Sequence, residues 1–163
     1  MMRFALTIIF LLLSVTDQNT SVSELRSLYK RAAEEETAAR KLLELTDGAT
    51  SAQPVTLGYF GVSHMMMAKH VGNPFKKFSY FNKGKEVFTE AIAAAPNNLE
   101  LRFLRFAVQA ETPGFLNYKQ NLEEDKKVLL AKTRNLKDTE LEQMILAYLV
   151  TSSALSDSEK ENL

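Results

Sequence analysis

The sequence predicts an all-α protein, and three features support this class. Apolar residues recur at spacings of three and four in several segments, which places them on one face of a helix. No segment shows the alternating pattern of a strand, and proline and glycine mark short breaks between the periodic segments. The 163 residues are enough for one domain with a substantial core. We expect about six helices, arranged as antiparallel hairpins in a short solenoid or a bundle.

The clearest helix pair lies in the middle of the chain. Phe88, Ala91 and Ala95 share one face of a first helix, which Pro96 ends because proline lacks an N–H and clashes with the preceding turn. Asn98 is suited to cap the next helix. That helix, 98–110, is apolar around most of its circumference, which predicts an inner position between neighbouring helices. One narrow polar stripe runs along it, made of Asn98, Arg102, Arg105 and Gln109.

Within this pair, four residues have the spacing of the second helix of a tetratricopeptide repeat. They are Gly84, Phe88, Ala91 and Pro96. The chain resembles this family over about one half-repeat, which implies a helical hairpin stacked against others. The wider segment 72–109 resembles a family of uncharacterised secreted proteins from Bacteroidota. That resemblance implies an exported location and no particular activity.

Residues 1–16 have the pattern of a signal peptide. Arg3 supplies the positive start, residues 4–13 form an apolar run interrupted only by Thr7, and residues 14–16 include the small residues of a cleavage site. A helix of this apolar run is about 15 Å long, about half the hydrocarbon core of a bilayer. The alternative is an uncleaved N-terminal anchor. We expect a periplasmic or secreted protein with no membrane span after cleavage, one helical domain at 17–155 and a flexible tail at 156–163.

Four further helices are expected outside the central pair. They cover approximately residues 21–47, 54–71, 115–133 and 139–149. In the second of these, Gly58 and Gly61 are interpreted as points where another helix backbone approaches closely. Glycine inside a helix otherwise costs about 1 kcal/mol relative to alanine.

The middle of the chain combines basic and aromatic residues. Residues 48–85 contain no acid, five lysines and six aromatic residues. Such a mixture can bind an anionic polymer through phosphate contacts and stacking on the rings. Alternatively, the aromatic side chains pack into the core while the lysines stay in water. We prefer this second interpretation.

Few residues in the sequence are suited to catalysis or to metal binding. Cysteine is absent, and His64 and His70 are six apart, whereas helical ligand pairs need a spacing of three or four. No GxSxG, HExxH or phosphate-binding glycine motif is present. The acids at 123–125 are interpreted as a solvated helix face, and the formal net charge of zero gives no general attraction to nucleic acid or to anionic membranes. We expect no enzyme, no cofactor and no metal.

We therefore expect an exported interaction module whose partner is another protein or a peptide. The candidate partner-binding residues are Arg102, Arg105, Gln109, Lys76, Lys77, Phe78 and Tyr80. The two arginines either line a groove or pair internally with acids such as Glu86 or Glu90, because a buried unpaired charge is prohibitive. We favour the groove. For the basic and aromatic segment, the alternative partner is an anionic envelope polymer or nucleic acid, and an unrecognised enzyme is the remaining alternative function.

Export is tested at the N-terminus of the protein. Mass spectrometry of protein from the native host should show a mature N-terminus between Val15 and Ser21, because cleavage follows the small residues after the apolar run. Recovery of the full-length chain from the cytosol would contradict this prediction.

Overall fold

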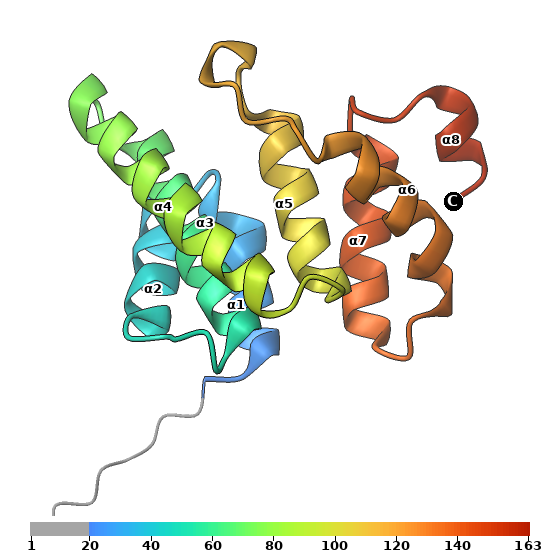
Figure 1. Cartoon of the computed structure of the whole chain (residues 1–163), viewed down its shortest axis with the longest axis horizontal. Coiled ribbons are helices and arrows are strands. Elements are labelled where there is room, and N and C mark those ends of the chain that lie inside the picture. Colours follow the sequence, from blue (N-terminus) through green and yellow to red (C-terminus); the bar gives the residue numbers. More distant parts are fainter. Residues whose placement is uncertain (1–19) are drawn as a thin grey trace, which may run out of the picture.

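The computed structural model describes residues 20–163, and this part of the chain is all-α, as predicted. The predicted signal peptide lies outside the described residues. The described part contains eight α-helices and two short 3-10 helices, rather than about six helices (Figure 1). The α-helices are α1 (Val22–Ala32), α2 (Glu36–Thr46), α3 (Pro54–His70), α4 (Pro74–Ala94), α5 (Leu99–Glu111), α6 (Leu122–Lys132), α7 (Thr139–Thr151) and α8 (Asp157–Glu161). The 3-10 helices are η1 (Gly114–Leu116) and η2 (Thr133–Asn135). None of the described helices is long and apolar enough to cross a bilayer.

The helices pack as successive hairpins. Helix α1 packs on α2, α3 on α4, and α5 on α6, while α1, α3, α5 and α7 contact one another in that order. Figure 1 shows α1–α4 on one side of α5 and α6–α8 on the other. Eight residues of α5 are buried, so its predicted inner position is confirmed.

The predicted helix at 21–47 is two helices, α1 and α2. The chain turns at 33–35, and Glu35 has an extended backbone before α2 begins. This turn reverses the chain, so that Ala32 at the end of α1 and Ala39 in α2 both pack against Met67 of α3. One straight helix would carry much of its apolar surface away from α3.

The predicted helix at 115–133 begins later than expected. Residues 114–116 form η1, and Asn117 then takes a left-handed conformation with φ 47°, which ends any continuous helix. Helix α6 therefore starts only at Leu122.

Two segments that were expected to be irregular are helical. The segment 72–79, which the sequence predicts as a loop with interleaved basic and aromatic residues, contains the start of α4, where the Asn73 side chain accepts hydrogen bonds from the N–H groups of Phe75 and Lys76. Pro74 occupies the first turn, where its missing N–H has no partner to lose. The tail expected to be flexible carries α8, with a capping box formed by Ser156 and Glu159.

Helices α3 and α4 approach each other most closely at two glycines. A Cβ atom on Gly84 would lie 2.5 Å from the carbonyl oxygen of Gly61. A Cβ atom on Gly61 would lie 2.9 Å from the backbone nitrogen of Phe88. The predicted close backbone approach is therefore confirmed at Gly61. At Gly58 the space is instead filled by the side chain of Leu101 from α5.

A methyl group at Gly84 should separate the α3–α4 hairpin. We expect Gly84→Ala to lower the free energy of unfolding by about 1–3 kcal/mol, because the nearest obstructing atom, the carbonyl oxygen of Gly61, belongs to the backbone and cannot move aside cheaply. Chemical denaturation measures the loss. Gly72→Ala is the matched control, because nothing lies within 4 Å of a Cβ atom there. Equal stability of the two variants would contradict the close approach.

Candidate functional site

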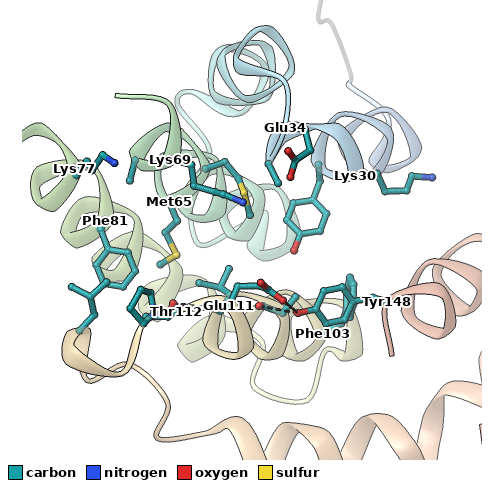
Figure 2. A pocket seen from close by; sticks show the side chains of 18 of the residues that line it. Lys30, Glu34, Met65, Lys69, Lys77, Phe81, Phe103, Glu111, Thr112 and Tyr148 are labelled. Atoms are coloured by element: carbon teal, nitrogen blue, oxygen red, sulfur yellow. Dashed lines mark hydrogen bonds between the residues drawn. The ribbon is translucent and has the colours of Figure 1, made fainter. Parts of the chain in front are cut away.

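An apolar cleft of about 850 Å³ lies between the two halves of the molecule. Residues of α1, α3 and α4 line one side, and residues of α5, η1 and α7 line the other (Figure 2). Most lining side chains are apolar, and they include Met65, Met66, Phe81, Phe103, Val108 and Met144. Phe78 and Phe115 also line the cleft and are largely exposed, so they lie at its edge.

A row of aromatic rings holds the lining helices together. The ring of Phe103 in α5 lies edge-on to Tyr29 of α1, with centroids 6.4 Å apart, and edge-on to Tyr148 of α7, at 5.7 Å. Tyr29 in turn lies edge-on to Tyr59 of α3, at 6.0 Å. Such edge-to-face pairs add to the stabilisation from burial itself. Four helices are thus joined across the base of the cleft.

Two phenols and a carboxylate are among the polar groups of the cleft. The Tyr148 hydroxyl lies 3.2 Å from both the Ala107 carbonyl oxygen and the Glu111 carboxylate, to either of which it can donate its proton (Figure 2). The Tyr29 hydroxyl makes no hydrogen bond within the described part of the chain. Burial raises the pKa of Tyr29 and the pKa of Tyr148, so both phenols stay neutral at physiological pH. The Tyr29 phenol can therefore donate a hydrogen bond to a bound group, whereas the Tyr148 proton already has two acceptors within the protein.

Charged side chains surround the apolar surface. Lys69 of α3 and Lys77 of α4 lie on the same side of the cleft, and Glu111 lies opposite them (Figure 2). Lys30, in the last turn of α1, and Glu34, just after this helix, complete this set. Within residues 20–163 none of these five side chains takes part in an ion pair. Their charges remain available to a ligand.

A buried ion cluster lies beyond the base of the cleft, where α1, α5 and α7 begin. The Arg26 guanidinium donates to both carboxylate oxygens of Glu100, at 2.8 Å each. It also donates to Asp138 at 2.7 Å and to Glu140 at 3.0 Å. The Tyr59 hydroxyl donates to Glu100 at 2.6 Å. The side chains of Arg26 and Glu100 are each only 6% exposed, so these bonds replace water almost completely.

The cluster also shifts proton affinities. Hydrogen bonds to its carboxylates, first of all to Glu100, raise the pKa of the Arg26 guanidinium. The same arginine is the main cause that holds the pKa of the Asp138 carboxyl below its usual range. Asp138 also caps α7 by accepting from the Leu141 N–H. Arg26 and Asp138 therefore stay charged over the whole physiological range of pH.

The predicted groove along the arginine stripe is wrong. Arg102 and Arg105 both pair with Asp125 of α6, at 2.9 Å and 2.6 Å, and Arg102 also pairs with Glu124. The partners are neither Glu86 nor Glu90. Asp125 is fully buried, so the solvated face predicted for residues 123–125 is also wrong at this position. The stripe is an internal contact between α5 and α6.

Gln109, the last residue of the stripe, is buried as well. Its side-chain oxygen accepts from the Asn121 N–H, and its Nε2 has no hydrogen-bond partner within the described residues. It therefore belongs to the same contact between α5 and the chain leading into α6. The three stripe residues predicted to bind a partner, Arg102, Arg105 and Gln109, do not line the cleft.

The basic and aromatic candidates divide between two places. Lys77 and Phe78 line the cleft, whereas Lys76 is exposed beside it and Tyr80 contacts the ring of His64. Phe75 and Phe78 are exposed, so the preferred interpretation that the aromatic residues of this segment pack into the core is wrong for these two. Tyr80 and Phe81 are partly buried, in agreement with it.

Sequence reasoning missed most of the cleft. Tyr29, Met65, Phe103 and Tyr148 come from four helices that are far apart in the chain. Each belongs to an apolar stripe or an apolar helix, so its pattern is the same as that of a core residue. Among the cleft residues, only Lys77 and Phe78 could be identified from the sequence, because basic and aromatic residues are interleaved there.

The two histidines are held by separate contacts. His64 packs edge-on against Phe60, and burial lowers its pKa, while His70 Nε2 lies 2.7 Å from the carbonyl oxygen of Ala32. In the part of the chain that the structure describes, no group of three or more His, Cys, Asp or Glu side chains is placed to hold a metal ion. Comparison of the chain with family models, with curated proteins and with solved structures gave no match.

Removal of Asp125 should strongly destabilise the contact between α5 and α6. Asp125→Ala leaves two largely buried guanidinium groups without their shared partner, and we expect a loss of about 3–5 kcal/mol in the free energy of unfolding. Glu124→Ala is the matched control, because Glu124 is the preceding residue, is exposed, and has Arg102 as its one ion-pair partner in the described residues. The melting temperature of the control should stay near that of the unaltered protein. A small loss in Asp125→Ala would mean that the stripe faces solvent.

Proposed function

We propose that the protein is an exported, non-catalytic interaction module that holds an apolar segment of a partner protein in the cleft. The observation that carries this proposal is the cleft itself, an apolar space of about 850 Å³ between packed helices. Ligand sites of helical proteins lie between their helices and are lined mainly by hydrophobic and aromatic side chains.

A helical segment of the partner suits the shape and chemistry of the cleft. Met65, Met66 and Met144 supply flexible, polarizable side chains that adapt to different apolar groups. Amphipathic helices bind in such grooves through apolar residues at spacings of three and four. The unpaired Lys69 and Lys77 on one side favour acidic residues at the edge of the bound helix.

The arrangement of the helices supports the same proposal. Hairpins that stack in sequence, with one helix of each pair contacting the next pair, present extended concave surfaces in helical-repeat proteins. The spacing of Gly84, Phe88, Ala91 and Pro96 adds the resemblance to a tetratricopeptide hairpin. The neutral phenol of Tyr29 offers a hydrogen bond that orients a bound segment.

Selection from a library of helical peptides tests the proposal. We expect the selected peptides to share two or more large apolar residues on one face, flanked by acids, and we expect Ala147→Trp to weaken their binding at least about tenfold. Ala147 is exposed and lines the cleft, so the larger side chain occupies the space without entering the core. Calorimetric titration measures the dissociation constants.

Ala131→Trp is the matched control, because Ala131 is also exposed and helical but lies on α6 outside the cleft. It should leave peptide binding unchanged. Selection of no peptide, or equal binding of the selected peptides to Ala147→Trp, would contradict the proposed function.

A further inference from the structure

A second surface with unusual exposure lies at one end of the molecule. Phe75, in the first turn of α4, is 85% exposed, and Phe115, in η1, is 80% exposed. They are the most exposed large apolar side chains in residues 20–163. Phe78, one turn after Phe75, is 49% exposed. Phenylalanine gains by leaving water, so two nearly free rings at one end of the molecule are suited to enter an apolar phase.

The two exposed rings belong to separate projections that point the same way. Figure 1 shows the start of α4 and the segment around η1 at the same end of the molecule, with a gap between them. Neither projection covers the other, and both can reach one flat surface at the same time. A flat partner therefore fits this end better than a narrow one, which would contact a single projection.

The charge around these rings is positive. Lys76 and Lys77 follow Phe75 directly, they form no ion pair within the described part of the chain, and residues 48–85 contain no acid. Lys119, four residues after Phe115, is exposed on the other projection. The acids nearest to this end in the cleft lining are Glu34 and Glu111. Exposed aromatic rings beside unpaired lysines match a partner surface that has an apolar interior under an anionic outer layer.

We propose that this end of the molecule docks on an anionic lipid surface. Phe75 and Phe115 enter the boundary between headgroups and acyl chains, and Lys76 and Lys77 contact the phosphates. An anionic polymer would use aromatic rings spaced along one groove for stacking, whereas these rings lie on two separate projections. The proposal goes beyond the proposed function: Phe75 and Lys76 lie outside the cleft, and Lys77 and Phe115, which line the cleft, connect the two surfaces.

The absence of tryptophan allows a site-specific test. The chain contains no tryptophan, so Phe75→Trp in the full chain carries a single fluorescent reporter. Vesicles of phosphatidylcholine and phosphatidylglycerol in equal parts, with bromine atoms on the acyl chains, should shift its emission to the blue and quench it. Vesicles of phosphatidylcholine alone should bind several-fold more weakly, and added salt should weaken binding to the anionic vesicles. Lys76→Gln, added to the reporter variant, should also weaken binding to the anionic vesicles several-fold.

Val22→Trp is the control at the opposite end, where α1 begins (Figure 1). It should show no quenching. Because Val22 follows residues 1–16 closely, attachment through that apolar segment would quench this reporter instead. Equal quenching of both variants, or none in Phe75→Trp, would overturn the proposal.

A third arm separates lipid from polymer. A single-stranded oligonucleotide that shifts the emission of Phe75→Trp as much as the anionic vesicles do would assign the surface to an anionic polymer and overturn lipid docking. Neither variant alters a residue of the cleft, so the peptide assay and the vesicle assay fail independently.

Discussion

The buried pair of Arg26 and Glu100 is the interaction on which both the helix arrangement and the cleft depend. Burying two charges costs desolvation free energy that is recovered only when the geometry is good and the remaining hydrogen-bonding positions are filled. Here the guanidinium meets Glu100, Asp138 and Glu140, and Tyr59 donates to Glu100. A shift of α1, α5 or α7 along its axis would break several of these bonds at once. Apolar contacts tolerate such shifts, so we infer that the cluster sets the register of the helices.

The cleft follows from this fixed point. Tyr29 lies one turn after Arg26, and Phe103 lies one turn after Glu100, so the helices that meet at the cluster also supply the aromatic base of the cleft. On the other side, the contact of Gly61 with Gly84 packs α3 and α4 backbone to backbone. Because the two backbones are in contact, we infer that α3 and α4 move as one unit, so neither helix can turn inward alone to fill the cleft. The cleft is therefore open because its two sides are each held by contacts elsewhere.

Most of the helices can be predicted from the sequence, because apolar periodicity and capping are local properties. The bounds of α3 and the buried circumference of α5 follow from them directly. The partners of charged residues are set by tertiary packing, and Asp125 illustrates the limit. It stands in a run of three acids that resembles any solvated face, yet it shares the apolar face of Leu122 and Leu129 at spacings of three and four. That spacing signals burial but does not identify Arg102 and Arg105 as the partners, because nothing local places α6 against α5.

The misread stripe explains why the cleft lies where it does. At 3.6 residues per turn, the face of α5 with Arg102 and Arg105 is opposite the face with Phe103, Ala107 and Glu111. The first face binds α6 through the buried carboxylate of Asp125, and the second lines the cleft. If the arginines had faced an open groove, α6 would have had to pack against another face of α5. The face with Phe103 was the remaining one. The ion pairs on one side of α5 thus leave its other side free for a ligand.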